Sequence, residues 1–284
     1  MAIPGIIYFA LFKYAPMWGV VIAFKDYVPF LGVIDSPWVN FKHFEYFFNN
    51  PMFGRLLGNT LVLSFMNILF FFPAPIILAL MLNELRSQRY KKIMQTMLYI
   101  PHFISIVIVV SISYVMFNST GIVYRAAYAL SGKPVNFLTD VGLFRPMIIG
   151  QTIWKETGWG TIIFLAALAG VDVQLYEAAA IDGAGRFRQL WHVTLPAIRS
   201  TIVLLLVLRM GSVLDTGYEH LILMANAMNR TVSQTFDVFV YQQGIQQGQY
   251  SYATAVGLFK SIISVTLVLG SNALAHKLGE PGLY

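Results

Sequence analysis

The chain has 284 residues, of which 57% are hydrophobic and only 11% carry a charge. Soluble domains are about 45–50% apolar and about 25% charged, so this composition indicates a protein that crosses a membrane several times. Cysteine is absent, which excludes a disulfide framework and a thiolate metal site. The formal net charge is +6, but the basic residues form short clusters between apolar runs. That pattern is typical of membrane orientation rather than of nucleic-acid binding.

Apolar runs long enough to cross a bilayer divide the chain. A hydrocarbon core about 30 Å thick needs about 20 apolar residues per helix. Runs of that length lie at about 3–24, 56–83, 97–117, 146–170, 197–224 and 253–275. The sequence therefore predicts an all-α polytopic membrane protein with six transmembrane helices in a single domain over 1–284. The opening residues lack the charged region and the cleavage site of a removable signal peptide.

Basic residues indicate which side faces the cytoplasm. The segments 84–96 and 171–196 and the C-terminal tail share one side, and their basic residues are Arg86, Arg89, Lys91, Lys92, Arg186, Arg188 and Lys277. The longer segments 25–55, 118–145 and 225–252 share the other side, with Lys25, Lys42, Arg55, Arg125, Lys133, Arg145 and Arg230. The two counts are equal, so only the density of charge distinguishes the sides. The denser side, with 84–96, is expected to be cytoplasmic and to hold both chain ends.

Polar side chains fall inside the predicted fourth and fifth helices. Charged groups at membrane depth are unfavourable unless they are paired or wet, so these side chains should face the bundle interior or a water-filled path. On one continuous helix, the polar residues of the fifth run would cover an arc of roughly 140°; they are Arg209, Ser212, Asp215, Thr216, Glu219 and His220.

Two interpretations of these residues stay open. Aromatic rings that stack on sugar faces, with amide and charged groups that reach hydroxyls, would suit a saccharide path. Its candidate residues are Gln151, Trp154, Lys155, Glu156, Trp159, Arg209, Asp215, Tyr218 and Glu219. The alternative is a structural ion pair that fixes helix packing, for example Lys155 with Asp215 or Glu219. Lys260, in the sixth run, would similarly pair with a carboxylate.

A polar segment between two apolar runs, 176–196, reads YEAAAIDGAGRFRQLWHVTLP. Residues 173–181 favour a helix with Asp172 as its N-cap, and Gly183 and Gly185 then end it. A second short helix follows, with apolar residues at i, i+3 and i+4: Phe187, Leu190 and Trp191. The sequence predicts a helix, a turn and a helix. A helix pair that rests on the membrane surface is the alternative.

The string E-A-A, followed by Gly183 and then by Leu195-Pro196, resembles the cytoplasmic EAA signature of permease subunits in binding-protein-dependent ABC importers. Other strings agree along the chain: FKYAPMWGVVIAFKDY, GNTLVLS, LYIPHFIS, IWKETGWGTIIFLAALAG and GQYSYATAVGLFKS. Together they resemble the carbohydrate branch, the permeases of complex-oligosaccharide or polysaccharide uptake in bacteria. The start departs from that pattern, because relatives carry a basic stretch before the first helix.

Pro196 is predicted to be the first residue of the next membrane helix. At that position a missing N–H costs no hydrogen bond.

The resemblance implies a type I importer permease (MetI-like) fold, in which 172–195 is the cytoplasmic coupling segment that docks on an ATPase. Its docking residues would be Glu177, Ala178, Ala179, Ala180, Asp182, Gly183, Leu195 and Pro196. The implied partners are a second homologous permease subunit, a cytoplasmic ABC ATPase dimer and an extracytoplasmic solute-binding protein. The implied function is import of an oligosaccharide or polysaccharide fragment across the bacterial cytoplasmic membrane by alternating access.

Motifs for catalysis are absent from the sequence. No G-x-x-x-x-G-K-[ST] loop occurs, so ATP and Mg would be used by the partner ATPase, and this chain is expected to bind no cofactor. Neither H-E-x-x-H nor G-x-S-x-G occurs, so no catalytic or metal-binding residue is predicted. The alternative function is an ion-coupled secondary transporter, in which charged residues such as Lys155, Glu156 and Asp215 relay protons. Against it, no inverted repeat is evident, and 172–195 would have no purpose without a docked motor.

Overall fold

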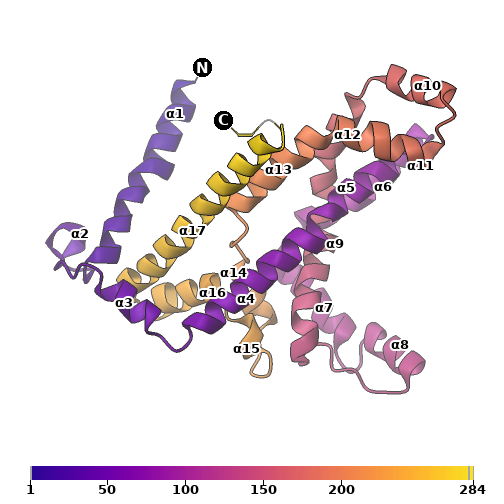
Figure 1. Cartoon of the computed structure of the whole chain (residues 1–284). Coiled ribbons are helices and arrows are strands. Elements are labelled where there is room, and N and C mark those ends of the chain that lie inside the picture. Colours follow the sequence, from indigo (N-terminus) through magenta and orange to yellow (C-terminus); the bar gives the residue numbers. More distant parts are fainter. Residues whose placement is uncertain (1, 281, 284) are drawn as a thin grey trace.

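The first apolar run forms one continuous helix with three kinds of turn. In the computed structural model, which describes residues 2–280, 282 and 283, α1 (Ile3–Phe9) continues into the π turn η1 (Ala10–Tyr14) and the 3₁₀ helix η2 (Ala15–Phe24). Pro16 has no N–H to donate to the preceding turn, which explains the irregular pattern there. Figure 1 shows this helix beside α17 and apart from the other long helices.

The second run is again one helix with a π turn before prolines. Two short helices, α2 (Gly32–Asp35) and α3 (Lys42–Phe48), come first. The long helix then comprises α4 (Phe53–Met66), η3 (Asn67–Phe71) and α5 (Pro73–Asn83). Pro73 and Pro75 lack N–H groups, so the normal i to i−4 pattern cannot continue through them. The helix starts at Phe53, slightly before the predicted start at 56, and ends at the predicted residue, Asn83.

Pro101 interrupts the third run. α6 (Gln88–Tyr99) passes into the 3₁₀ turn η4 (Ile100–Phe103), and α7 (Ile106–Phe117) starts afresh after Ser105. The Ser105 hydroxyl caps α7 by accepting from the N–H of Ile108. α8 (Ile122–Ser131) follows after a break at 118–121 and contacts α7. The predicted run 97–117 therefore contains a break, because a proline and an N-cap serine stand inside it.

α9 (Val141–Ala169) follows, and the carboxylate of Asp140 caps it by accepting from the N–H of Gly142 at 2.7 Å. This helix packs along α5 and against α6 and η4. At Gly158 it approaches α6 so closely that an added Cβ would lie 1.9 Å from the carbonyl oxygen of Leu98. Only a residue without a side chain allows that approach.

We expect Gly158→Ala to destabilise the protein, because the new methyl group would overlap the Leu98 carbonyl and force α6 and α9 apart. Overpacking of this kind typically costs about 1–3 kcal/mol. Gly150→Ala in the same helix is the matched control, since a Cβ there would meet no atom within 4 Å. Thermal unfolding of the purified protein in detergent measures the difference. Equal unfolding midpoints for the two variants would contradict the close approach.

The prediction that 197–224 form one helix is wrong. The short elements α11 (Arg186–Gln189), η5 (Leu190–Thr194) and α12 (Leu195–Ala197) meet α13 (Arg199–Gly211) at a bend of 58°. Residues 212–217 are not helical, and α14 (Tyr218–Met224) starts after Gly217, whose φ is +74°. The 140° arc of polar residues therefore does not exist, because its members lie partly in α13, partly in the break and partly in α14.

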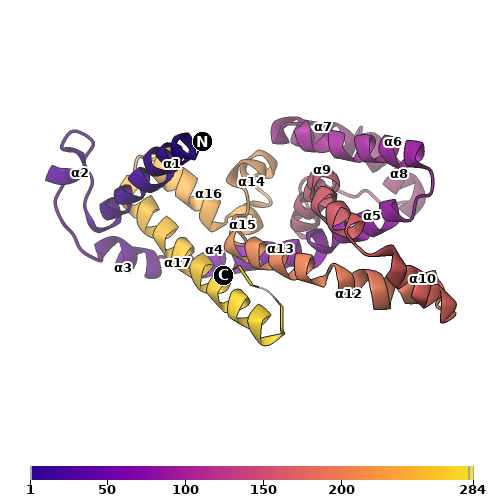
Figure 2. The same ribbon diagram turned by 90° about the horizontal axis from the view of Figure 1, so that it is seen from above.

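The segment 225–252, predicted as a loop, is folded and packed. It contains α15 (Arg230–Ser233), α16 (Phe236–Val240) and η6 (Tyr241–Gln246), and α17 (Tyr250–Lys277) follows. Figure 2 shows α16 between α14 and α17, and it contacts both. An apolar cluster joins α3, α4, α16 and α17, with buried members Phe47, Leu56, Phe236, Phe239, Tyr252 and Val256. Apolar burial thus holds this segment in place.

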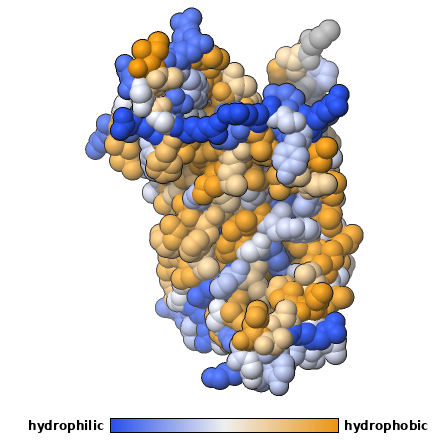
Figure 3. Space-filling view, turned by 90° about the vertical axis from the view of Figure 1, so that its right-hand side faces the viewer, coloured by the Kyte–Doolittle hydropathy of each residue, from blue (hydrophilic) through white to orange (hydrophobic). Residues whose placement is uncertain are grey.

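Several helices of the described residues are long and apolar enough to cross a membrane. Four do so as single stretches: 3–24, 53–83, 106–131 and 250–277. Two bent pairs raise the number to six when each pair counts as one span: 141–169 with 173–181, and 186–197 with 199–211. Figure 3 shows a broad hydrophobic band between two hydrophilic ends. This division agrees with a polytopic membrane protein.

The three segments predicted to share one side lie at the same end of the molecule. Glu84 Oε2 is 3.9 Å from Arg186 Nη1, and Arg199 Nε is 2.7 Å from Glu280 Oε1. Figure 1 places the start of α1, the end of α17 and α10 (Val173–Ile181) at this end, with α2, α3 and α15 toward the other. We refer to these as the α10 end and the α3 end.

Candidate functional site

The segment 172–196, here named the α10 hairpin, has the predicted helix, turn and helix. The Asp172 carboxylate caps α10 by accepting from the N–H of Gln174 at 2.9 Å, which confirms the expected N-cap. Gly183 has φ +74°, a conformation that disfavours any side chain with a Cβ. A bend of 69° separates α10 from α9, so the hairpin projects sideways at its end of the molecule (Figure 1).

Internal hydrogen bonds hold the α10 hairpin together. The Tyr176 and Thr194 hydroxyl oxygens lie 3.0 Å apart and link α10 to η5. Across the turn, the N–H of Ala184 donates to the carbonyl of Ala179 at 2.8 Å. The Gln189 amide donates to the carbonyl of Ala184 at 3.0 Å. These hydrogen bonds therefore connect the two helices and the turn of the hairpin into one unit.

The predicted docking residues lie mostly on the surface. Ala179 and Leu195 are half-buried, and the others are exposed: Glu177, Ala178, Ala180, Asp182, Gly183 and Pro196. Pro196 is not at the start of the membrane helix as predicted, because it lies in α12, before the bend into α13. Three apolar side chains on α10 are also open, with Val173 65%, Leu175 50% and Ile181 87% exposed. Apolar side chains around a charged one are typical of a protein contact surface.

A first group of interior residues joins α9 to the break at Pro101. Lys155 Nζ donates to Glu156 Oε1 at 2.8 Å and to the carbonyl of His102 at 2.7 Å. Glu156 Oε2 lies 2.6 Å from His102 Nδ1. The His102 ring stacks on Trp159 with ring centroids 4.4 Å apart and an angle of 4°. The predicted pair of Lys155 with Asp215 or Glu219 is therefore wrong, since the carboxylate next to Lys155 in sequence is its partner.

A second group closes the break between α13 and α14. Lys260 Nζ lies 2.5 Å from Asp215 Oδ1 and also pairs with Asp237 Oδ1. The other Asp237 oxygen accepts from the N–H of Thr216 at 2.7 Å and from its hydroxyl at 3.2 Å. Lys260 and Asp237 are mostly buried, with side chains 13% and 17% exposed, whereas Asp215 is 63% exposed. One lysine thus ties the non-helical segment to α16 and α17.

Two further candidates are held by polar side chains in the interior. The Gln151 amide donates to Ser113 Oγ at 2.7 Å, and its Oε1 lies 2.5 Å from His220 Nε2. Gln151 is buried, so this network contributes to helix packing. Arg209 donates to Asn67 Oδ1 at 2.9 Å, with its guanidinium 5.5 Å from the Phe71 ring centroid.

The remaining candidates keep accessible surface. Trp154 is 50% exposed, Trp159 46% and Tyr218 46%, and Glu219 is exposed as well. Tyr218 stacks on Tyr241 with centroids 4.8 Å apart at 19°. The predicted pathway residues therefore do not form one stripe. Lys155, Glu156 and Trp159 belong to the first group and Asp215 to the second, Gln151 and Arg209 have other hydrogen-bond partners, and Trp154, Tyr218 and Glu219 are exposed.

Sequence reasoning missed three of the partners. The sequence places His102 in a predicted helix and gives no signal for its side-chain partner. It places Asp237 and Tyr241 in a segment predicted to be a loop. For Asp237 a signal existed, because Thr235 followed by FDVFVY has the N-cap and apolar pattern of a short buried helix. The Thr235 side chain does cap α16. For His102 no local signal existed, because its contacts come from residues 53 and 54 positions away.

Comparison with known proteins assigns the chain to a family. Residues 71–279 match the model of the binding-protein-dependent transport system inner membrane component. The chain belongs to this family. The matched range includes the α10 hairpin and all residues of the two interior charged groups. The protein is therefore a membrane-spanning importer permease, and the ion-coupled alternative is set aside.

Similar proteins cover the whole chain. Protein LplB of Bacillus subtilis (strain 168) is 57% identical over 100% of this permease and 90% of its own length. The polygalacturonan/rhamnogalacturonan transport system permease protein YteP of the same strain is 55% identical, over 100% and 89%. A chain in the crystal structure of a bacterial alginate ABC transporter, in complex with an alginate pentasaccharide-bound periplasmic protein, matches with a TM-score of 0.91 at 39% identity, over 100% and 95%. The predicted all-helical MetI-like fold is confirmed.

Proposed function

We propose that this permease is the membrane subunit of an ATP-driven importer that moves an oligosaccharide or polysaccharide fragment across the bacterial cytoplasmic membrane. Its relatives transport polygalacturonan or rhamnogalacturonan, or form an alginate transporter. The proposed partners are a second permease subunit, an ATPase dimer that uses ATP and Mg, and an extracytoplasmic solute-binding protein. The α10 end, with both ends of the chain, faces the cytoplasm, and the α3 end faces outward.

The exposed α10 hairpin carries this proposal. It is connected internally, projects from the long helices and offers Glu177 among apolar side chains, which suits a docked protein rather than solvent. ATP-driven movement of the ATPase dimer would shift the hairpin as a unit. Because the hairpin continues directly into α9 and α12–α13, its displacement would tilt the helices and open the path inward.

The interior polar groups suit a path for hydroxyl-rich ligands. Trp154, Trp159 and Tyr218 keep open aromatic surface, and Asp215 keeps an open carboxylate. Ring faces and hydrogen-bonding groups together are what sugar recognition uses. The Lys155–Glu156 pair is neutral, whereas the Lys260 group has two carboxylates, Asp215 and Asp237, against one ammonium. All of these charges have a partner within the protein, and we assign both groups the positioning of the path side chains.

Charge reversal on the hairpin tests the proposed function. We expect Glu177→Lys to reduce both the ATPase captured with the tagged permease and saccharide uptake by about tenfold or more, since each requires the docked hairpin. Asp35→Lys, an equal charge change on the exposed α2, is the matched control. Subunits pulled down from native membranes are identified by mass spectrometry. A wild-type pull-down without ATPase, or undiminished capture by Glu177→Lys, would contradict the proposal.

A further inference from the structure

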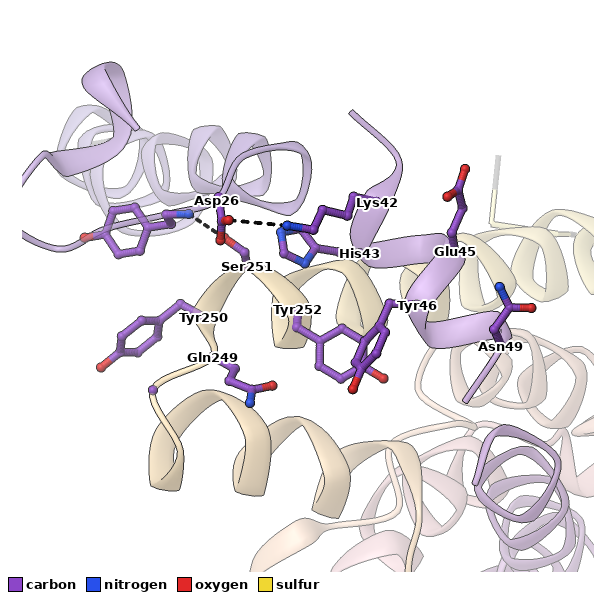
Figure 4. Close-up of a pocket in the computed structure, with 12 residues that line it drawn as sticks. Asp26, Lys42, His43, Glu45, Tyr46, Asn49, Gln249, Tyr250, Ser251 and Tyr252 are labelled. Atoms are coloured by element: carbon purple, nitrogen blue, oxygen red, sulfur yellow. Dashed lines mark hydrogen bonds and ion pairs between the residues drawn. The ribbon is translucent and has the colours of Figure 1, made fainter. Parts of the chain in front are cut away.

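A cleft of about 640 Å³ lies at the α3 end, and no residue of the α10 hairpin or of the two interior charged groups lines it. Its walls come from α3, the start of α17 and the residues just after η2. Figure 4 shows Tyr46 and Tyr252 with their rings next to one another, Gln249 and Tyr250 across from them, and Asp26 and Lys42 above. We name this hollow the tyrosine cleft. None of the residues predicted from the sequence as site residues lines it.

Its aromatic side chains are anchored but open. Tyr252 is only 4% exposed, and its hydroxyl accepts from the Asn50 amide at 3.2 Å. Tyr46 packs edge-on against Tyr252 with centroids 5.1 Å apart, yet remains 64% exposed. Tyr250 is supported by Tyr27 at 6.0 Å and is 39% exposed. Two supported rings thus offer free surface, which is what stacking on the apolar face of a pyranose ring requires.

The polar side chains of the cleft supply both donors and acceptors. Glu45, Asn49 and Gln249 have no side-chain hydrogen bond or ion pair within the described part of the chain. Lys42 and Asp26 form only an exposed pair at 3.5 Å, which is weak and can open to a ligand. Hydroxyl groups both donate and accept, so this mixture fits them.

The charge of the cleft narrows the class of sugar. Two carboxylates, Asp26 and Glu45, line it against one ammonium group, Lys42. A uronate carboxylate would meet more negative than positive charge, whereas a neutral pyranose would meet no such repulsion. The cleft therefore favours uncharged sugar units, even though relatives of this permease transport acidic polymers.

The cleft is preformed by the fold. The N–H of Tyr27 donates to Ser251 Oγ at 2.9 Å and joins the segment after η2 to α17, with Ser251 buried. Below it, the fully buried Phe47 fixes α3 in the apolar cluster with Phe236 and Val256. Gly248, with φ +71°, turns the chain into α17. A preformed hollow loses little entropy on binding a ligand.

We propose that the tyrosine cleft is a contact site for neutral pyranose units on the outward face of the permease. The cleft receives the saccharide before the saccharide enters the interior path. This inference rests on the proposed function, because it takes the substrate to be a saccharide. A protein surface that docks the solute-binding protein is the competing assignment, and the hollow shape with unpaired amides favours a small hydroxyl-rich ligand.

Saturation-transfer NMR on the assembled importer in nanodiscs, without the solute-binding protein, tests the cleft. The probes are the neutral tetraoses of glucose, galactose, mannose and xylose, beside tetragalacturonate. We expect at least one neutral tetraose to bind, and Tyr46→Ala and Tyr250→Ala to weaken that binding by about fivefold or more. Tyr46→Phe should keep most of it, because the ring remains. Tyr128→Ala, on α8 outside the cleft with Tyr128 51% exposed, should leave it unchanged.

The outcomes separate this inference from the proposed function. Unfolding midpoints and subunit composition of each variant show whether the complex is intact. If wild-type importer with its binding protein takes up saccharide but the two alanine variants bind every tetraose as wild type does, only the cleft assignment is overturned. Binding of tetragalacturonate alone, no binding of any probe, or loss of binding-protein capture without loss of sugar binding also overturns it. Absence of ATP-dependent saccharide uptake by wild type would instead contradict the proposed function.

Discussion

Gly183→Val is expected to abolish most saccharide uptake while the permease still reaches the membrane. Gly183 has φ +74°, and a left-handed conformation costs a residue with a Cβ about 1–2 kcal/mol, more for a β-branched one. No atom would lie within 4 Å of the new Cβ, so the effect comes from the backbone turn and not from a clash. A free-energy penalty of that size shifts the turn by about 5–30-fold toward other conformations.

The measurement for this variant is ATP hydrolysed per saccharide imported in proteoliposomes that contain the full importer. We expect that ratio to rise by about tenfold, because the ATPase would cycle without a correctly shaped hairpin. Gly185→Val is the matched control: Gly185 has φ −68° and also has no atom within 4 Å, so valine fits there. Gly183→Asn should keep partial function, since asparagine tolerates the left-handed region. Normal coupling in Gly183→Val would contradict the docking role of the turn.

Lys260→Met is expected to destabilise the permease by about 3 kcal/mol, because it leaves the largely buried Asp237 carboxylate without its cation. Asp237 would still accept from Thr216, but the link from the α13–α14 break to α17 would be lost. The unfolding midpoint in detergent and the uptake rate are both expected to fall.

Two further variants test whether the loss of stability comes from the unpaired Asp237 carboxylate. Adding Asp237→Asn to Lys260→Met should restore part of the stability, because the unpaired charge is removed. Lys42→Met breaks an ion pair whose side chains are 63% and 54% exposed, so its cost should stay below about 1 kcal/mol. If Lys260→Met and Lys42→Met shift the midpoint equally, the Lys260 group is not the structural tie described above.

The elements predictable from the sequence are those that local pattern decides. Apolar runs predict where the long helices lie. The Asp172 cap and the Gly183 turn of the α10 hairpin are also confirmed. Both were predictable because a capping side chain and a positive φ depend on a few adjacent residues. The break at 212–217 was missed because the helical wheel assumed one continuous helix. There, Gly217 and tertiary hydrogen bonds from Thr216 to Asp237 replace helical ones.

The partners of the charged residues could not be predicted. Lys155 is predicted to pair with a carboxylate on another helix, yet its partner is the next residue, Glu156, and its ammonium also donates to the carbonyl of His102. Lys260 was expected to find some carboxylate, but Asp237 stood in an assumed loop. Such contacts depend on which helices meet, and hydropathy along one chain does not contain that information. The docking and pathway roles of the predicted site residues stay predictions.

Cross-linking from a single cysteine on α10 tests the central proposal most directly. The chain contains no cysteine, so Ala178→Cys gives a unique thiol on an exposed position of the hairpin. In native membranes we expect this thiol to cross-link to a copurifying ATPase subunit and to react with a membrane-impermeant maleimide only after the cells are opened. Asp35→Cys on α2 should show the reverse labelling and no such cross-link. An Ala178→Cys thiol that is labelled from outside intact cells, or that never cross-links to an ATPase in the active importer, would contradict the account.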